Sequence, residues 1–423
     1  MRARILIRTA VLDVASFAVG AVVASLIVFE TPLPWVGQPR IWPLLGYLFA
    51  GAAFGAYVSS RMWGNGIPRP SYGRAVAIAV WAVGGAALSL IATRAYFSRP
   101  FLGITAATSL GLMLAHRAYS RSKPWHERLI LITAEKKLID DLQMAPHADV
   151  VAVYDPAGDP PELPDANATL AVDLRAVLSP PMAQFVSSSN LSGIVTRSVA
   201  SVYEEHTGRY AMALLAEGWE LSAPVEQSSA YAPVKRVIDI VLVLLAAAPA
   251  AVLSAMIAVA VRLDSPGPVL FHQRRIGRHG APFTLHKFRT MRTDAEANGA
   301  RLAVRDDPRL TRFGRWLRKT RMDELPQLWN VLIGDLSLVG PRPEQPEFVA
   351  EFERRIPFYS HRHLVRPGIT GWAQVNYGYA DDEADTIEKL TFDLYYVRHM
   401  SFWLDMQVLG RSIWTVLTGF GAQ

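Results

Sequence analysis

The segment TRMDELPQLWN, from Thr320 to Asn330, places two carboxylates, Asp323 and Glu324, side by side behind a run of arginines. Carboxylates can act as nucleophiles and as metal ligands. Adjacent carboxylates also repel each other, and acidic neighbours of this kind usually lie on a solvated surface. This segment alone therefore leaves open whether the pair does chemistry.

Basic residues and sharp turns gather around this pair, in the part of the chain after Asp264. The segments are DSPGPVLFHQRRIG, FTLHKFRTM, TRMDELPQLWNVLIGDLSLVGPRP and VRPGITGWAQVN. Arginine offers a bidentate fork to a phosphate, lysine offers a point charge, and Gly-Pro turns let backbone N–H groups approach an anion. Each segment is a weak signal by itself, but together they favour recognition of a phosphate.

Composition indicates where such chemistry takes place. The chain is 51% hydrophobic and 19% charged, which is too apolar for an ordinary soluble enzyme, so we expect membrane segments. Cysteine is absent, which excludes disulfides, thiolate zinc sites and cysteine nucleophiles. The net charge of +6 indicates affinity for anionic headgroups or phosphates. We expect no nucleic-acid partner, because basic and aromatic residues do not alternate in a stripe.

Four apolar runs occupy the first part of the chain, at residues 9–29, 41–60, 74–93 and 101–119. Each has about the ~20 residues needed to cross the hydrocarbon core of a bilayer. We therefore predict a transmembrane anchor of four helices over residues 1–122. A cleavable signal peptide is the alternative for residues 1–30, although the apolar stretch exceeds the usual ~7–15 residues.

The basic residues around these runs predict their orientation. They cluster before the first run, between the second and third, and after the fourth: Arg2, Arg4, Arg8, Arg61, Arg69, Arg74, Arg117, Arg121, Lys123 and Arg128. By the positive-inside rule both ends of the anchor face the cytoplasm, although Arg94 and Arg99 weaken this assignment. Asp13 is an intramembrane charge and hence a functional candidate, but near a helix end it could simply reach toward the interface.

Residues 123–228 have a different pattern. RLILIT, DVVAVYD, ATLAV and SGIVT are typical of strands, with AEKKLIDDLQM and PPMAQFVSSSN as connecting helices. This alternation predicts a small parallel α/β domain. A dinucleotide site would need a glycine-rich turn after the first strand, whereas the turn here reads TAEKK. We therefore expect a degenerate nucleotide-binding-like domain that serves packing or oligomerisation.

A fifth apolar stretch, from Ile240 to Val261, contains no charged residue and is long enough to span a bilayer. Basic residues flank both of its ends, and Pro249 near its centre removes a helix hydrogen bond. We predict a re-entrant helix over about residues 234–263 that breaks at Ala248-Pro249 and leaves on the face where it entered. A proline-kinked full span is the alternative.

The segment RLTRFGRWLRKT, residues 309–320, has an amphipathic helical pattern. One face holds Leu310, Phe313, Trp316 and Leu317, and five basic residues cover the remainder. We expect this helix to lie in an anionic membrane interface. The alternative is an ordinary surface helix whose apolar face packs on a protein core.

From about Ala232 onward the chain resembles the bacterial monotopic phosphoglycosyl transferases, which transfer a sugar phosphate to a polyprenyl phosphate. The matching segments are KRVIDIVLVLL, DSPGPVLFHQRRIG, HKFRTM, RMDELPQLWNVLIGDLSLVGPRP, RPGITGWAQVN and KLTFDLYYVRHMSFWLDMQVL. The helices and α/β domain before them resemble the long form of this family. The resemblance implies a membrane protein whose mostly helical α/β catalytic domain, residues 229–423, is monotopic and carries the re-entrant helix. One departure is Ala248, where many relatives have serine before the membrane proline.

The resemblance also implies roles for individual residues. Members of this family use an Asp-Glu dyad with Mg²⁺, and the matching residues here are Asp323 and Glu324. Asp323 would attack the β-phosphorus of a UDP-sugar and expel UMP, and undecaprenyl phosphate would then accept the sugar phosphate. Both carboxylates would bind the Mg²⁺ ion, and nearby cations would keep Asp323 ionised. The substrate-binding candidates are Lys287, Arg289, Arg321, Arg342 and Arg366.

The expected function is therefore an undecaprenyl-phosphate hexose-1-phosphate transferase that initiates exopolysaccharide, capsule or O-antigen assembly. Glucose or galactose is the expected sugar, by family association. One alternative is the same reaction with a UDP-N-acetylhexosamine, and another is a non-catalytic membrane scaffold that binds lipid-linked sugars. The resemblance implies the bacterial inner membrane, with the catalytic domain on the cytoplasmic face. We also expect a homodimer, contact with the lipid bilayer, and downstream glycosyltransferases as partners.

Overall fold

The computed structural model divides the chain into two compact units, residues 1–127 and 128–423. It describes residues 2–62, 72–94, 98–122, 126–161, 168–214, 225–292, 309–377 and 383–418. The two units are treated separately below. The domain boundaries expected after residues 122 and 228 stay predictions.

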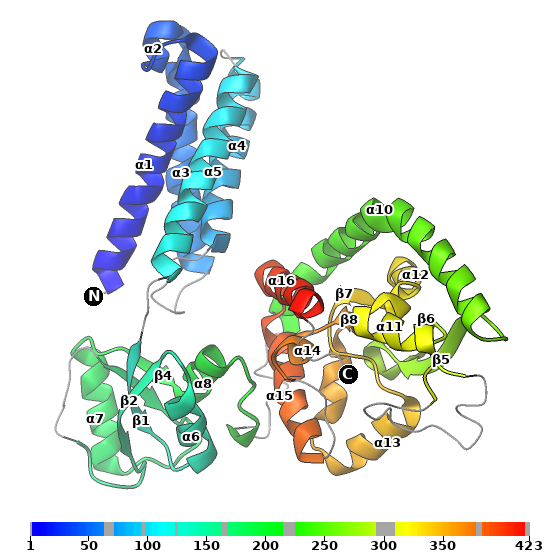
Figure 1. The fold of residues 1–423 in the computed structure, drawn as a ribbon. Coiled ribbons are helices and arrows are strands. Elements are labelled where there is room, and N and C mark those ends of the chain that lie inside the picture. The colour runs from blue at the N-terminus through cyan, green and yellow to red at the C-terminus, as the bar shows by residue number, and fades with distance from the viewer. Residues whose placement is uncertain are drawn as a thin grey trace. The chain divides into compact units, whose positions relative to one another are not determined.

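The first unit is a bundle of long helices (Figure 1). Its elements are α1 (Arg2–Phe29), α2 (Pro34–Gly37), η1 (Pro39–Ile41), α3 (Trp42–Met62), α4 (Tyr72–Thr93) and α5 (Arg99–Ser122). Side chains from the four long helices form one buried apolar core, which includes Phe17, Leu48, Ile78 and Phe101. The four predicted apolar runs are thus helical in the structure.

Two helices of this unit are long and apolar enough to cross a membrane, at Thr9–Gly37 and Tyr72–Thr93. A third such helix, Tyr231–Asp264, lies in the second unit, and these three are the ones found among the described residues. The helices α3 and α5 form as expected but do not add to that number. The prediction of four spans therefore stays a prediction.

Asp13 does not reach toward an interface. Its side chain is buried and receives two hydrogen bonds from the guanidinium of Arg117, at 2.6 and 2.8 Å. The pair joins α1 to α5, and Arg117 is itself fully buried. A bidentate pair of this kind offsets the cost of removing two charges from water. The expectation that Asp13 would extend to the interface was wrong, since its partner is inside the bundle.

The second unit begins with the α/β domain, and the expected parallel sheet is present (Figure 1). Its strands are β1 (Glu127–Ile132), β2 (Ala148–Tyr154), β3 (Thr169–Val172) and β4 (Thr196–Ser198), in the order β2-β1-β3-β4. Its helices are α6 (Lys136–Met144), α7 (Pro180–Leu191), α8 (Val199–Thr207) and η2 (Met212–Leu214). The fourth strand starts later than SGIVT predicted, because Ser192 and Gly193 form the turn after α7.

The remainder of the second unit is mostly helical, as expected. Its helices are α10 (Val225–Asp264), η3 (Arg278–Gly280), α11 (Arg312–Thr320), η4 (Met322–Glu324), α12 (Gln327–Ile333), α13 (Pro346–Arg355), η5 (Tyr359–Leu364), α14 (Trp372–Asn376), α15 (Glu383–His399) and α16 (Phe402–Thr418). The strands β5 (Leu270–Ile276) and β6 (Pro282–Phe288) form an antiparallel hairpin, and β7 (Ser337–Val339) pairs in parallel with β8 (Gly368–Thr370).

The apolar helix α10 differs from the prediction. It is one continuous helix of 40 residues with Pro233 and Pro249 inside it, so the expected interruption at Ala248-Pro249 is absent. The helix is instead strongly bent, and both of its ends return to the mostly helical part of the second unit (Figure 1). A proline can bend a helix without ending it, because only one or two backbone hydrogen bonds are lost.

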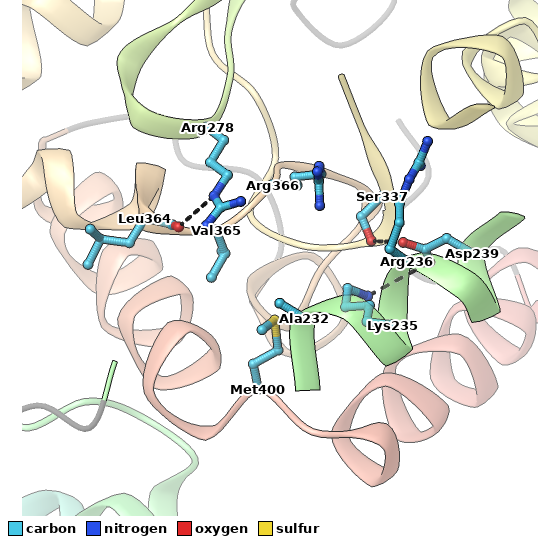
Figure 2. Close-up of a pocket in the computed structure, with 10 residues that line it drawn as sticks. All are labelled: Ala232, Lys235, Arg236, Asp239, Arg278, Ser337, Leu364, Val365, Arg366 and Met400. Carbon is cyan, nitrogen blue, oxygen red and sulfur yellow. Dashed lines mark hydrogen bonds and ion pairs between the residues drawn. The ribbon is translucent and has the colours of Figure 1, made fainter. Parts of the chain in front are cut away.

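Both ends of α10 bind the same body of protein. Near its start, Asp239 accepts a 2.7 Å hydrogen bond from Ser337 of β7 (Figure 2). Near its end, Val261 packs with Phe288 and Leu317 in a buried cluster. The segment between these ends is exposed, with Leu245 74% and Val252 64% accessible. An apolar helix exposed in this way needs a cover from outside the described residues of this unit, such as lipid.

The amphipathic segment forms α11, and its apolar residues do not share one environment. Leu317 is fully buried and packs against α10, and Phe313 joins the same cluster. Trp316 stacks on Phe313 at 5.3 Å but is 48% exposed. The helix therefore packs part of its apolar face on a protein core and leaves one aromatic ring outward, and its place in a membrane interface stays a prediction.

Candidate active site

The two adjacent carboxylates lie in η4, a single tight turn between α11 and α12. Arg321 ends α11 with a left-handed backbone (φ 58°), a conformation that costs energy for a side chain other than glycine. Its N–H bonds back to the carbonyl groups of Leu317 and Arg318, which closes the helix. The chain then turns sharply into Met322–Glu324. This turn brings Asp323 and Glu324 inward instead of leaving them on a solvated helix face.

A close backbone approach holds α11 and η4 against the end of β6. A Cβ atom on Gly314 would lie 2.1 Å from the carbonyl oxygen of Thr290, so glycine is required at this contact. Thr311 caps the helix by accepting a 2.9 Å hydrogen bond from the N–H of Gly314. The dyad is therefore positioned by main-chain packing that tolerates little displacement.

The Asp323 side chain is buried, with 7% of its surface exposed. Its Oδ1 atom is fully enclosed and accepts no hydrogen bond from the described residues. Buried carboxylate oxygens are normally satisfied, and an unsatisfied one indicates a catalytic or metal-binding role. The solvated-surface interpretation of the pair is thus wrong for Asp323.

Burial and the neighbouring charge of Glu324 raise the pKa of Asp323 to about 6. Lys287, Arg318 and Arg321 act in the opposite direction, but their effect is smaller. We expected the cations to dominate and to favour the charged form, so the net direction corrects that expectation. The carboxylate is still mostly ionised at neutral pH.

Glu324 has a different environment from its neighbour. Its Oε1 atom accepts a 3.1 Å hydrogen bond from Arg342 and lies 3.8 Å from Arg321. Burial raises the pKa of Glu324, but these two arginines lower it more, so the net shift is downward. The pKa values of the two carboxylates are thus shifted in opposite directions, so Asp323 takes up a proton at a higher pH than Glu324 does.

Lys287 of strand β6 places a positive charge near both carboxylates. Burial and the surrounding arginines lower the pKa of Lys287 to about 8, while Asp323 raises it. Its ammonium group also lies 5.2 Å from the centre of the Phe271 ring on the paired strand. A lysine with this pKa stays mostly charged at pH 7 and can serve an incoming phosphate.

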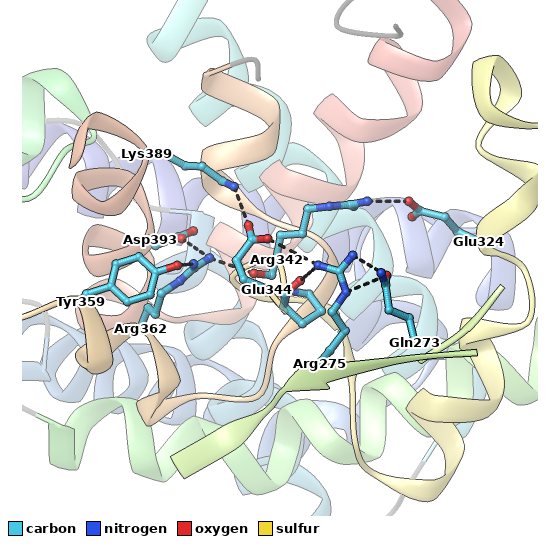
Figure 3. A network of polar contacts seen from close by, with 10 residues as sticks. Gln273, Arg275, Glu324, Arg342, Glu344, Tyr359, Arg362, Lys389 and Asp393 are labelled. Atoms are coloured by element: carbon cyan, nitrogen blue, oxygen red, sulfur yellow. Dashed lines mark hydrogen bonds and ion pairs between the residues drawn. The ribbon is translucent and has the colours of Figure 1, made fainter. Parts of the chain in front are cut away.

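A buried polar network supports the loop that carries Arg342 (Figure 3). Arg362 donates a 2.8 Å hydrogen bond to the Arg342 carbonyl and pairs with Asp393 of α15 at 2.8 Å. Glu344 accepts from Lys389 at 3.0 Å and faces Arg275 at 3.5 Å. Burial opposes ionisation of Glu344, but these cations lower its pKa to about 2. The network fixes the main chain at Arg342 and directly after it.

Five of the seven predicted site residues meet at this place: Asp323, Glu324, Lys287, Arg321 and Arg342. The other two, Arg289 and Arg366, make different contacts. Arg289 is buried and donates to the carbonyl and hydroxyl of Ser265, just after α10. Arg366 donates to the carbonyl of Gly334 at 3.0 Å and faces Arg236 and Arg278.

Comparison with known proteins places this chain among relatives. A model of the family described as bacterial sugar transferase matches residues 230–419. The UDP-glucose:undecaprenyl-phosphate glucose-1-phosphate transferase of Caulobacter vibrioides is 42% identical over 186 residues, which cover 44% of this chain and 70% of the relative. The chain belongs to the bacterial sugar transferase family.

Two further relatives are matched over a smaller share of their own length. The UDP-N-acetylgalactosamine-undecaprenyl-phosphate N-acetylgalactosaminephosphotransferase of Aeromonas hydrophila is 45% identical over 243 residues, 57% of this chain and 56% of the relative. The UDP-glucose:undecaprenyl-phosphate glucose-1-phosphate transferase of Escherichia coli (strain K12) is 44% identical over 190 residues, 44% of this chain and 40% of the relative. The chain thus spans about half the length of these two relatives.

Sequence reasoning missed several residues of this bacterial sugar transferase. Arg318 was assigned to a membrane-facing helix, but it donates to Thr290 at 3.0 Å and acts electrostatically on Asp323. Glu344 and Arg362 gave no sequence signal beyond their nearness to the GPRP and VRP segments. Their partners on α15 are distant in sequence, so the network could be recognised only from the folded chain.

Proposed function

We propose that this bacterial sugar transferase moves a sugar 1-phosphate from a UDP-sugar to undecaprenyl phosphate through a covalent intermediate on Asp323. The observation that carries the proposal is the buried Asp323 carboxylate, which has an unsatisfied oxygen and cations on several sides. The names of the relatives support the donor and acceptor classes.

The first step forms a bond between an Asp323 oxygen and the β-phosphorus of the UDP-sugar. The bond from this phosphorus to the bridging oxygen breaks, and UMP leaves with that oxygen and its electron pair. Lys287, Arg321 and Arg342 offset the negative charges that meet in this step. Asp323 must be ionised, and its pKa of about 6 leaves it so at neutral pH while keeping it a better nucleophile than a fully stabilised anion.

The second step regenerates the enzyme. An oxygen of undecaprenyl phosphate attacks the same phosphorus, the bond to Asp323 breaks, and the carboxylate is restored. The product is undecaprenyl diphosphate sugar. The same cations serve both steps, because in each step negatively charged oxygens gather around the same phosphorus atom beside Asp323.

We propose Mg²⁺ as the cofactor, held by Asp323 and Glu324. The described residues contain no cluster of three or more metal-ligating side chains. This fits Mg²⁺, which commonly uses one or two carboxylates together with substrate phosphates and water. The unsatisfied Oδ1 of Asp323 is a suitable ligand atom. When bound, the metal would neutralise charge on the diphosphate.

The sugar has two candidates. Glucose or galactose is our expectation, and relatives named for glucose are similar to this chain. N-acetylgalactosamine is favoured by a different observation, since the relative named for that sugar matches over a longer stretch of 243 residues. A panel of UDP-sugars would distinguish the two.

The test is release of UMP by the purified full chain with undecaprenyl phosphate and Mg²⁺, for UDP-glucose, UDP-galactose and their N-acetylated forms. We expect release with one of these donors and removal of activity by chelation of the metal. Failure with every donor, for a folded protein, would favour the alternative of a non-catalytic scaffold.

We further propose that α10 enters and leaves the cytoplasmic leaflet of the bacterial inner membrane, with the catalytic region in the cytoplasm. Support comes from the bend of α10 and from the contacts that both of its ends make with the same region (Figure 1). The chain has no cysteine, so cysteines introduced singly would report accessibility without background. Labelling of positions after residue 270 from outside the cell would contradict this topology.

A homodimer and contacts with downstream glycosyltransferases belong to the same proposal. The anchor and the α/β domain offer surface that catalysis does not use. Light scattering of the purified chain would give the oligomeric state, and a monomer at all concentrations would contradict the dimer.

A further inference from the structure

A second basic site lies at the foot of α10, separate from the residues of the dyad. A cavity of about 520 Å³, including its open mouth, is lined there by Arg236, Arg278, Arg366 and Lys235, with Asp239 as its carboxylate (Figure 2). Within the described part of the chain, none of the cations that face Asp323 and Glu324 lines this cavity. The cavity has room for a phosphate group and the first atoms attached to it.

The acidic groups near this cavity are already engaged. Lys235 pairs with Asp405 at 2.7 Å and lies 3.9 Å from Asp239. Asp239 also accepts a hydrogen bond from Ser337. Lys235 thus balances part of this negative charge, and Asp239 also acts on Arg366, so two carboxylates face one lysine and three arginines.

The three arginines are held by neutral carbonyl groups. Arg236 donates to the carbonyls of Val331 and Leu332, Arg366 to that of Gly334, and Arg278 to that of Leu364. Among the described residues, none of the three forms an ion pair with a carboxylate. Burial, Arg278 and Arg236 lower the pKa of Arg366, and they outweigh Asp239, which raises it. Three like charges around one cavity are unfavourable unless an anion joins them.

The cavity lies where the apolar helix begins. Its residues Lys235, Arg236 and Asp239 come from the first turns of the apolar stretch Tyr231–Asp264. Val237 and Val241 on the same turns are 61% and 48% exposed. Basic residues at the end of an apolar membrane helix lie at the level of lipid headgroups. A lipid phosphate at that level can reach the cavity without leaving the membrane.

We infer that this cavity binds the phosphate of an anionic membrane lipid and so anchors the start of α10 at the headgroup layer. The inference rests on the proposed membrane position of α10 and not on the transfer reaction. Lipid binding can therefore be absent in a protein that releases UMP, and UMP release can be absent in a protein that binds the lipid. The two proposals are thus tested independently.

The experiment is native mass spectrometry of the purified full chain in a nonionic detergent, without UDP-sugar. The separate probes are phosphatidylglycerol, phosphatidylcholine and inorganic phosphate. We compare the wild type with Arg278→Gln, Arg366→Gln and their combination. Arg354→Gln is the matched control, because Arg354 is an exposed arginine on α13 that contacts its own helix.

We expect phosphatidylglycerol to bind more tightly than phosphatidylcholine. Each substitution in the cavity should weaken phosphatidylglycerol binding about fivefold, the usual effect of one basic residue at a membrane surface, and the control should not. Arg278 is exposed, so its substitution should leave the melting temperature unchanged even if Arg366→Gln destabilises the fold.

Three outcomes would overturn the inference. Equal binding of the two lipids would exclude recognition of anionic charge. Unchanged phosphatidylglycerol binding in folded Arg278→Gln would place the lipid elsewhere. Inorganic phosphate that binds as tightly as phosphatidylglycerol would make this a site for a free anion instead of a lipid.

Discussion

Replacement of Arg342 by glutamine tests how the dyad is held. Glu324 Oε1 has two cationic neighbours, Arg342 at 3.1 Å and Arg321 at 3.8 Å, and only the nearer one is within hydrogen-bond distance. A hydrogen bond to a charged group contributes about 1.5–3 kcal/mol. The Arg342 side chain is 37% exposed, so solvent reduces this to about 1–1.5 kcal/mol. Since about 1.4 kcal/mol corresponds to tenfold in rate, kcat/KM should fall about 5- to 15-fold.

The assay is UMP release with the preferred UDP-sugar, accompanied by the melting temperature of each variant. Arg342→Lys keeps the charge but loses the planar fork, so its kcat/KM should lie between those of the wild type and Arg342→Gln. Arg354→Gln is the control for removal of one positive charge and should be neutral. A folded Arg342→Gln that keeps kcat/KM within twofold of the wild type would refute the role given to this contact.

The remaining predictions concern the dyad carboxylate, its support and its polar network. The pKa of Asp323 is raised on folding, so ionisation of this carboxyl destabilises the folded protein as pH rises from about 4 to 6. Asp323→Asn should therefore raise the melting temperature at pH 7.5, and less so at pH 5. Thermal scans that show the same effect at both pH values would contradict the raised pKa. Activity should fall as pH drops below about 6, because the nucleophile becomes protonated, and a pH–rate profile flat to pH 5 would argue against this. Gly314→Ala should lower the free energy of unfolding, measured with denaturant, by about 1–3 kcal/mol. Gly410→Ala is the control and should not lower it, because a Cβ atom there meets nothing within 4 Å. Equal effects of the two substitutions would contradict the close packing of Gly314 on Thr290. Glu344→Gln should lower kcat more than it raises KM, since the network positions Arg342 without contacting substrate, and a pure KM effect would exclude that role.

The sequence predicted those features that depend on local patterns. Apolar length gave the helices of the first unit, and the alternation of strands and helices gave the parallel sheet. The Asp-Glu pair could be singled out by its resemblance to a family motif. Its burial could not be predicted, because it follows from the left-handed turn at Arg321 and from the contact between Gly314 and Thr290.

Arg289 illustrates why motif neighbours need not share a function. Lys287 and Arg289 are two residues apart, so they would point to the same face if the strand continued. The strand β6 ends at Phe288, and Arg289 turns to bind Ser265 after α10. The end of a strand is poorly specified by sequence, and the direction of one side chain depends on it.

Contacts between distant segments were also beyond reach of the sequence. Asp13 and Arg117 lie in different helices, and either could have faced lipid or an interface. Pro249 marked where α10 departs from a straight helix, but whether the helix bends or breaks there could not be predicted from the sequence. Tertiary packing therefore decided the features that the sequence left open.

The covalent intermediate on Asp323 is tested most directly by the mass of the intact protein after incubation with its UDP-sugar and Mg²⁺, without undecaprenyl phosphate. We expect a mass gain of one sugar phosphate, located by peptide mapping to the segment with Asp323. This gain should be lost on addition of undecaprenyl phosphate and absent in Asp323→Asn. Transfer that proceeds at full rate in Asp323→Asn, or a phosphosugar on another residue, would contradict it.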